Sequence, residues 1–333
     1  MITNKSAMYR RTPMFFSRVP IMCLFFIIGT CGFPFSAQAI DILLGTGEPG
    51  TYSHFTGRIL CRVINSQMSD MNCEIVPAPG DVHNLTNLRG GSLDIGLVDS
   101  RMLFDAVNKS GYFEFLDISY ENLRVLAPMY DIPITLVVRS DAGITALGDL
   151  KGKRINAGAP RSLQHLAMDT IMKAKNWSKN DFSLMGELPP SQSQDTMAFC
   201  HGTLQAMVHI GVHPDSSLQQ LFKLCKANLV NMNDADIEKL VNDHPEFFNI
   251  DITADTYASH PGKVATFGTR AMLVASEDID EETVYKIMEA IDSNKKRLTS
   301  AHPSLSLFYV DTAQKSVTGM QHHPGAVKFF TKP

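Results

Sequence analysis

Two short stretches carry the residue types that bind small anions. The first, Asp41–Phe55, runs from apolar residues through glycines at 45, 47 and 50 to Thr51, which opens an amphipathic run. The second, Arg154–Ser162, repeats that order with a strand pattern, Gly158 and a serine before the next amphipathic run. A helix that begins at such a turn leaves its first N–H groups unpaired and carries about half a positive charge there. We therefore expect each stretch to form part of a binding site for a small organic anion.

Arg161 adds a fixed positive charge to the second stretch. A guanidinium at the start of a helix can hold a carboxylate with two hydrogen bonds. The alternative is a solvated arginine on the protein surface. The two aromatic residues of the first stretch have different expected roles. Tyr52 lies near the turn and is the better candidate for a ligand contact, whereas Phe55 is expected in the core.

Other chemistry is poorly supported. His201, His209 and His213 lie near Cys200, but the strand pattern and Gly211 between the last two histidines do not suit a metal site. The sequence contains no Gly-x-Ser-x-Gly, Walker or His-Glu-x-x-His motif. The turn at residues 45–50 approximates a dinucleotide fingerprint, yet no acidic residue closes the second strand. We expect no metal, no cofactor and no enzymatic activity.

The segments that follow the first turn alternate between strand and helix patterns. Expected helices are Thr51–Gln67, a second one opened by Pro79-Gly80-Asp81 and ended by Gly90-Gly91, and Arg101–Asn108; expected strands are Cys73–Pro77, Asp94–Val98 and Leu123–Ala127. This alternation predicts a mostly parallel sheet covered by helices, with ligands bound at the carboxyl ends of the strands.

A second unit is expected to begin with a strand at Ile134–Val138. Further expected strands are Arg154–Gly158, Leu204–Ile210 and Val264–Ala275, and further expected helices follow Ser162 and span Asp234–Asp243 and Glu281–Leu298. The helix after Ser162 would bury Leu163, Leu166 and Ile171. The long strand Val264–Ala275 would cross from one lobe to the other with a bend at Gly268.

The first 39 residues are typical of a signal peptide. A basic start is followed by the apolar run Val19–Phe35 and by the cleavage pattern Ala37-Gln38-Ala39. A retained anchor, or lipidation at Cys31, is the alternative. Cleavage after Ala39 removes four of 30 basic residues and leaves 294 residues with 26 basic and 34 acidic side chains, a net charge of −8. That charge, without any Lys/Arg run, argues against nucleic acid as a partner. We expect a soluble protein in the periplasm.

Four cysteines remain after cleavage. In an exported chain, an even number predicts disulfides, with three possible connectivities, whereas buried free thiols are the alternative. Pairing of sequence neighbours, Cys61 with Cys73 and Cys200 with Cys225, would close two short loops, each worth about 3 kcal/mol.

The chain resembles the TAXI group of extracytoplasmic solute receptors, which are the binding components of tripartite ATP-independent periplasmic (TRAP) transporters. The stretches that carry the resemblance run from near residue 42 almost to the end of the chain: Gly45-Thr-Gly-Glu-Pro-Gly-Thr-Tyr52, Cys73-Glu-Ile-Val-Pro-Ala-Pro-Gly80 with Asn84, Leu150-Lys-Gly-Lys-Arg-Ile-Asn156, Gly211-Val-His-Pro214, Val264-Ala-Thr-Phe-Gly268 and His323-Pro-Gly-Ala326. The four mature cysteines also lie where one subgroup of this family has them.

The resemblance implies an α/β fold of the type II periplasmic-binding-protein class. Two α/β lobes would be joined by two crossing strands, and the ligand cleft would lie between the lobes. Lobe 1 would comprise residues 40–131 and 268–333, and lobe 2 residues 132–267. A monomer would close on an amino acid such as glutamate, or on another organic acid, and deliver it to a TRAP-type membrane permease.

The resemblance also implies a set of ligand-binding residues. These are Gly47, Thr51, Tyr52, Gly80, Asp81, Asn84, Asp99, Ser100, Arg161, Ser162, His165, Gly211 and His213. The sequence departs from the subgroup at four of its contact loops, where Gly80-Asp81 replaces Gly-Ser, Asp99-Ser100 replaces Gln-Ser, Pro160-Arg161-Ser162 replaces Gly-Ser-Gly, and His201 replaces an acidic residue. These departures leave the identity of the ligand open.

The two aspartates each have two interpretations. Either could hold an ammonium group of the ligand, or cap the helix that follows it. Capping is favoured for Asp81, and Asp99 is left open between the two roles. Together with Arg161, they suit an amino acid or another zwitterion better than a dicarboxylate. The first functional interpretation is therefore a transport receptor, followed by a ligand sensor that presents its closed form to a signalling partner, and last by an exported enzyme.

Overall fold

The computed structural model describes residues 39–187, 194–258, 262–306 and 320–332. All of the expected signal peptide except Ala39 lies outside the described residues. No helix in these four ranges combines the length and the apolar character that a membrane crossing requires.

The first part of the described chain alternates between strands and helices, as the sequence predicts. Its elements are β1 (Ile40–Thr46), α1 (Tyr52–Gln67), β2 (Met71–Pro77), α2 (Asp81–Arg89), β3 (Ile95–Asp99), α3 (Ser100–Asn108), the 3₁₀ turn η1 (Gly111–Phe113) and β4 (Leu123–Arg139). Strand β1 pairs in parallel with β2 on one side and β3 on the other. The carboxyl ends of these strands therefore lie at the same edge of the sheet, where α1, α2 and α3 begin.

The second part contains shorter strands. Its elements are η2 (Leu147–Leu150), β5 (Arg154–Asn156), α4 (Leu163–Lys175), η3 (Lys179–Asp181), β6 (Leu184–Gly186), α5 (Gln194–Cys200), β7 (Ala206–Ile210), α6 (Ser216–Leu224), β8 (Ala227–Val230), α7 (Ala235–Asp243) and β9 (Phe248–Ile252). Strand β5 pairs in parallel with β6 and β7. Ser162 caps α4 and Asp234 caps α7, as polar residues before helices commonly do.

The last part returns to the first group of strands. It comprises β10 (Val264–Ser276), α8 (Glu281–Ser293), α9 (Lys295–Ala301), η4 (Pro303–Ser306) and α11 (Pro324–Phe330). The single helix expected over Glu281–Leu298 is wrong, because Asn294 leaves the helical conformation and separates α8 from α9. The residues expected to face inward from α8, including Ile287 and Met288, are fully buried.

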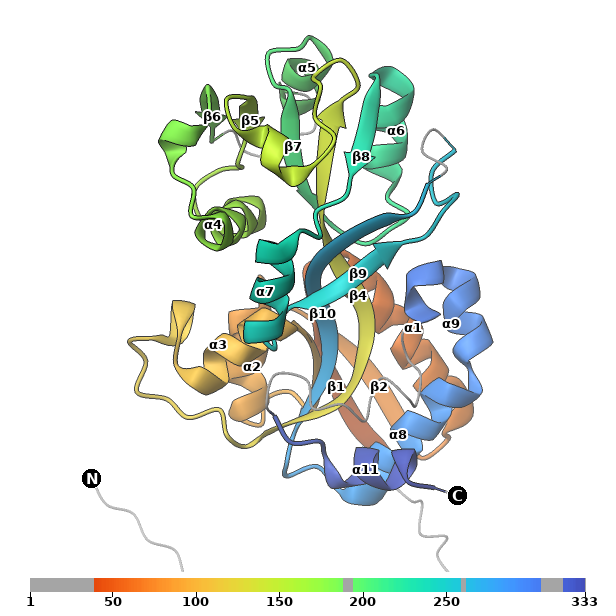
Figure 1. The fold of residues 1–333 in the computed structure, drawn as a ribbon. Helices are drawn as coiled ribbons and strands as arrows, with labels where there is room; N and C mark the ends of the chain where they lie inside the picture. Colours follow the sequence, from red (N-terminus) through yellow and green to blue (C-terminus); the bar gives the residue numbers. More distant parts are fainter. Residues whose placement is uncertain (1–38, 188–193, 259–261, 307–319, 333) are drawn as a thin grey trace, which may run out of the picture. The chain divides into compact units, whose positions relative to one another are not determined.

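Strands β4 and β10 run through both groups (Figure 1). In the described residues the strand order is β2-β1-β3-β10-β4-β7-β5-β6, with β8 also paired to β4 and β9 to β10. Strand β10 is antiparallel to β3 near one end and to β9 near the other. The sheet is therefore mixed rather than mostly parallel. The expected lobe boundaries, 131/132 and 267/268, fall inside these two strands, and the division into lobes remains a prediction.

Strand β4 is one element of 17 residues, where the sequence predicted two separate strands. The first of these expected strands ended before Pro128, because proline lacks the N–H that the hydrogen bonds of a sheet need. The structure tolerates Pro128 beside a register shift between Ala271 and Met272 of β10. Pro133 lies opposite Gly268, where an added Cβ would be only 2.2 Å from the carbonyl oxygen of Ile132. Gly268 thus allows a close strand crossing, and the irregularities of β10 lie further along the strand.

Buried apolar residues form separate clusters on the two sides of this crossing. Leu44, Leu60 and Met288 belong to a cluster around β1, α1 and α8. Ile155, Ile171 and Phe267 belong to another, around β5, α4 and the start of β10. Each group of strands therefore has a hydrophobic core of its own, which is the arrangement expected for two lobes.

Two disulfides connect sequence neighbours, Cys61 with Cys73 and Cys200 with Cys225. Of the three possible connectivities, the neighbour pairing is the one present. The first bridge joins α1 to β2, and the second joins the end of α5 to the residue after α6.

Candidate functional site

A cavity of about 450 Å³ lies between the two groups of elements. Its walls are mostly aliphatic and aromatic and come from β3, β4, α3 and β10 on one side and from α4, β7 and the α7–β9 connection on the other. Charged side chains interrupt this apolar surface at five positions: Asp81, Asp99, Arg101, Asp105 and Arg161. A concave apolar site with a few polar groups is the usual form of a small-molecule site.

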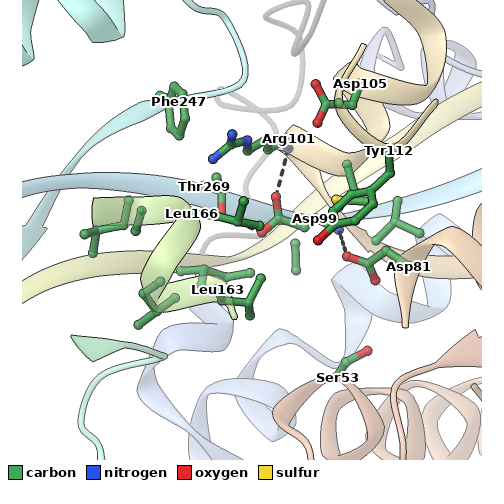
Figure 2. Close-up of a pocket in the computed structure, with 18 of the residues that line it drawn as sticks. Ser53, Asp81, Asp99, Arg101, Asp105, Tyr112, Leu163, Leu166, Phe247 and Thr269 are labelled. Carbon is green, nitrogen blue, oxygen red and sulfur yellow. Dashed lines mark hydrogen bonds between the residues drawn. The ribbon is translucent and has the colours of Figure 1, made fainter. Parts of the chain in front are cut away.

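Asp81 and Asp99 lie next to each other in the cavity wall (Figure 2). Asp81 is the first residue of α2, and its Oδ2 accepts a hydrogen bond of 3.0 Å from the main-chain N–H of Asp99. Asp99 accepts the N–H of Arg101 at 2.8 Å on Oδ1 and the hydroxyl of Thr269 at 2.5 Å on Oδ2. Asp99 is thus the cap of α3, whereas the capping role favoured for Asp81 is wrong. The sequence did not indicate this contact, because the partner of Asp81 is the main chain at the end of β3, 18 residues further along.

Burial beside a second carboxylate changes the acidity of both aspartates. Removal from water and the negative charge of Asp99 raise the pKa of Asp81 to about 7. Burial also raises the pKa of Asp99, although its bonds from Thr269 and Arg101 oppose that rise. Tyr130 lines the same cavity, and burial together with the negative charge of Asp81 raises the pKa of its hydroxyl. This end of the cavity therefore has a surplus of negative charge that protons can neutralise.

Arg101 connects α3 with elements on the opposite side of the cavity. Its Nη1 donates to the hydroxyl of Thr170 in α4 at 3.1 Å, and its guanidinium lies 5.7 Å from the centre of the Phe247 ring. The neighbouring residue makes a similar connection, because the Ser100 hydroxyl donates to the carbonyl oxygen of Glu246 at 2.8 Å. These contacts join the two walls of the cavity directly.

Arg161 lines the cavity from the turn before α4. Its backbone is in the left-handed region, with φ of 68°, and Gly158 precedes it with φ of 82°. Ser162 then caps α4 by accepting the N–H of His165 at 3.2 Å. Arg161 is exposed and forms no ion pair with any residue in the described ranges, so its charge is available to a ligand. Leu163 and Leu166 line the same wall, and Leu163 is 65% exposed rather than packed in the core.

The first glycine turn meets the cavity through Ser53. The N–H of Gly47 donates to Ser53 Oγ at 3.2 Å, while Thr51 caps α1 by accepting the N–H of His54. The ring of Tyr52 packs edge-on against Tyr130, 4.7 Å between centres. The Tyr52 hydroxyl lies 2.6 Å from Ser304 Oγ, so its visible role is to support the wall. The core position expected for Phe55 is wrong, since that side chain is 39% exposed.

Other expected site residues are engaged in packing or lie elsewhere. Asn84 is fully buried and donates to the carbonyl oxygen of Thr46, and Gly80 precedes α2 without lining the cavity. Gly211 and His213 line two further hollows rather than this cavity. Of the thirteen expected site residues, the cavity wall contains Asp81, Asp99 and Arg161.

His213 belongs to a buried polar network beside those hollows. Its Nε2 lies 2.8 Å from Thr135 Oγ1 and its Nδ1 lies 2.5 Å from the hydroxyl of Tyr257. That hydroxyl also accepts the N–H of Asp215 at 2.9 Å. Burial and the neighbouring His209 lower the pKa of His213 to about 3, so the ring is neutral. Within the described ranges, no group of His, Cys, Asp and Glu side chains is arranged to hold a metal ion.

Several cavity residues carry no signal in the sequence. Arg101 was assigned to a helix without a role, Tyr130 lay between two expected strands, and Thr269 lay inside an expected apolar strand. Only the pairing of β10 with β3 on one side and with β4 on the other brings Thr269 and Tyr130 to the wall that contains Asp99. A polar residue inside an apolar strand was the one available indication for Thr269.

Residues 44–332 match the NMT1-like family. This match covers most of the chain. The protein belongs to the NMT1-like family. Among solved structures, this NMT1-like protein is similar to a TctC solute-binding protein from Polaromonas, with 13% identity, 82% of this chain and 90% of that chain covered, and a TM-score of 0.56. It is also similar to the periplasmic aliphatic sulphonate-binding protein SsuA from Escherichia coli, with 13% identity, 88% and 82% coverage and a TM-score of 0.48. The first of these likenesses establishes the periplasmic-binding-protein type of fold.

Proposed function

We propose that this NMT1-like protein is an extracytoplasmic solute receptor. It binds a small carboxylate-bearing solute, such as an amino acid or another organic acid, and releases it unchanged. The observation that carries the proposal is the cavity of about 450 Å³ whose walls come from both ends of the crossing strands β4 and β10. A solute in that position contacts both walls at once, so binding favours the closed arrangement of the lobes.

The charges of the cavity support a solute with a carboxylate. Arg161 lines the wall at the turn before α4 without a carboxylate partner among the described residues. A planar guanidinium beside the N-terminus of a helix is well suited to a carboxylate, because both attract negative charge. Ser162 and His165 belong to the same turn and are the next candidates for contact.

A membrane permease of the TRAP type is the proposed partner, and the periplasm the proposed location. The support is the resemblance of the loop sequences to the TAXI group, together with the two disulfides, which persist in oxidising compartments. The similar structures are described as solute-binding proteins, and one of them as periplasmic. A receptor with this fold could instead present its closed form to a signalling partner, and detection of a neighbouring permease gene would favour transport.

Native mass spectrometry of the freshly purified protein tests the proposal. A receptor is expected to retain a fraction of its solute, seen as an added mass that denaturation releases for identification. Isothermal titration of the released compound into stripped protein should then give one site per chain. Conversion of that compound into a product would instead indicate an enzyme. A protein that carries no solute and binds none from panels of amino acids and organic acids would contradict the receptor function.

A further inference from the structure

The carboxylate pair at one end of the cavity points to the class of solute. We propose that Asp81 accepts an ammonium group of the solute, and that the rest of the solute is an apolar, aromatic or branched body rather than a second acidic group. This inference rests on the proposed receptor function and concerns the same cavity. It distinguishes an apolar amino acid or amine from a dicarboxylate such as glutamate.

The hydrogen bonds separate the roles of the two aspartates. Both oxygens of Asp99 are occupied, one by the N–H of Arg101 and the other by the hydroxyl of Thr269. Asp81 uses Oδ2 for the N–H of Asp99, and no described residue donates to its Oδ1. Asp81 lines the cavity, so this oxygen is the one available to a ligand. Because Asp99 and α2 fix Asp81 from behind, an incoming donor meets a preorganised acceptor.

Arg101 offsets part of the negative charge of Asp99, whereas Asp81 lacks an ion-pair partner among the described residues. No lysine, arginine or histidine of the described residues forms an ion pair with Asp81, and the surrounding carboxylate of Asp99 makes a negative charge there less favourable. In the absence of a ligand, burial and the charge of Asp99 both favour the protonated carboxyl, and together they raise the pKa of Asp81 to about 7. An ammonium group supplies the same positive charge and donates hydrogen bonds as well. A second carboxylate at this end would instead add to the repulsion.

The remaining walls suit an apolar body. Ile132 and Ile134 come from the crossing strand β4. The opposite side contributes further apolar side chains: Leu163, Leu166, Ile210 and Phe247. Figure 2 shows Leu163 and Leu166 on the helix that faces the aspartates, and Phe247 beside Arg101. A charged or strongly hydrated group against these side chains would lose its water without a replacement partner. An apolar group placed there gains free energy in proportion to the surface it buries.

Three matched compounds test the inference by titration calorimetry on solute-stripped protein. Phenylalanine carries both charged groups, 2-phenylethylamine lacks the carboxylate, and 3-phenylpropanoate lacks the ammonium. We expect phenylalanine to bind, 2-phenylethylamine to bind more weakly, and 3-phenylpropanoate to bind at least about tenfold more weakly than phenylalanine, the loss expected for one charged hydrogen bond. Equal or tighter binding of 3-phenylpropanoate overturns the inference.

Two isosteric variants test the role of Asp81 independently of the choice of compound. Asp81→Asn keeps an oxygen for the N–H of Asp99 but cannot carry charge, so phenylalanine should bind about ten- to a hundredfold more weakly while 3-phenylpropanoate is unaffected or improved. Asp117→Asn, at an exposed position outside the cavity, is the control and should leave both affinities unchanged. Retained affinity for phenylalanine in Asp81→Asn contradicts the role of Asp81.

The two proposals fail in different ways. Tighter binding of glutamate or another dicarboxylate than of phenylalanine overturns the ammonium inference and leaves the receptor function in place. A protein that binds none of these compounds and releases no small molecule on denaturation contradicts the receptor function itself.

Discussion

The main-chain N–H of Asp99 donates to the side chain of Asp81 across 3.0 Å, and so connects the end of β3 with the start of α2. The bond fixes two carboxylates side by side in the wall of an otherwise apolar cavity. A single N–H cannot offset the combined cost of burial and like charge, so the pKa of Asp81 is raised to about 7.

This relationship gives the protein a pH-dependent stability. Because the pKa of Asp81 in the folded protein lies above that in the unfolded chain, the folded state holds the proton between about pH 4 and about pH 7. The free energy of unfolding should therefore fall as the pH rises through that window. Asp81→Asn, which cannot titrate, should gain stability relative to the unmodified protein as the pH rises from about 4 to about 7.

Denaturant titrations at several pH values measure this effect, with Asp117→Asn as the control that should follow the unmodified protein. Other charged or titratable groups line the cavity and contribute to both curves: Asp99, Arg101, Asp105, Tyr112, Tyr130 and Arg161. The informative quantity is therefore the difference, at each pH, between the free energies of unfolding of Asp81→Asn and of the unmodified protein. Parallel curves for Asp81→Asn and the unmodified protein would contradict the raised pKa.

Replacement of Arg161 tests the carboxylate end of the site. Arg161→Ala should weaken binding of the natural solute by about 1.5–3 kcal/mol, because a charged hydrogen bond is lost. Arg58→Ala removes an exposed arginine of α1 that does not line the cavity, and should leave affinity unchanged. Calorimetric titration with the compound released from the purified protein measures both. Unchanged affinity in Arg161→Ala would remove this residue from the site.

The bond between Arg101 and Thr170 should slow release of the solute. Thr170→Val removes the acceptor while preserving the charge of Arg101 and the side-chain shape. We expect a loss of about 1 kcal/mol, close to fivefold, in affinity, seen mainly as faster dissociation. Thr299→Val, at a half-buried threonine of α9 that does not line the cavity, is the matched control. Stopped-flow fluorescence measures the rates, and identical dissociation from the Thr170 variant and the control would show that the contact plays no part in closure.

Gly268 should tolerate no side chain, since the Cβ of an alanine would lie 2.2 Å from the carbonyl oxygen of Ile132. Separation of β10 from β4 at this point is expected to cost about 1–3 kcal/mol of stability or more. The control is Gly148→Ala, because a Cβ at that position meets no atom within 4 Å. Chemical denaturation compares the two variants. Equal stability of the two variants would contradict the close approach of Gly268 to the carbonyl oxygen of Ile132.

Each disulfide should contribute about 3 kcal/mol to stability by shortening the open loops of the unfolded chain. Serine replacement of both Cys61 and Cys73 tests one bridge, and the same change at Cys200 and Cys225 tests the other. Thiol titration of the denatured, unreduced protein after export should detect none of these four cysteines. A free thiol at any of them would contradict the pairing.

Local patterns in the sequence were sufficient for most helices and for the α/β alternation, whereas the type of fold was predicted from the family resemblance. Three of these helices begin at a residue whose side chain accepts an N–H group of the first helical turn: Thr51, Ser162 and Asp234. The capping residue and the N–H group that it binds are therefore only two or three residues apart in the sequence. Turn glycines and apolar periodicity act at the same short range. The two glycine turns were accordingly found, as was the crossing strand at Val264–Ala275.

The candidate site depends on contacts between distant parts of the chain. The partner of Asp81 is 18 residues away, that of Arg101 is 69 residues away, and Thr269 reaches Asp99 across 170 residues. Local patterns carry no information about such pairs, so the sequence assigned Asp81 to a cap and gave Arg101 no role. For the same reason, the sequence predicted that a strand ends before Pro128. In the structure β4 continues through Pro128, because a register shift in β10 accommodates the proline.

The sequence by itself determined an α/β chain with glycine turns before helices and charged residues at those turns, and it predicted that the chain is exported. Only the tertiary structure decided which of these charges meet. Pairing of β3 with β10 brings Asp99 beside Thr269, and the N–H of Asp99 holds Asp81 of α2 in the same wall. Helix α4 lies across the cavity and is bonded to Arg101 through Thr170. The physical reason is that local elements follow from interactions between near neighbours, whereas a binding cavity and its pKa shifts arise from the packing of segments far apart in the chain.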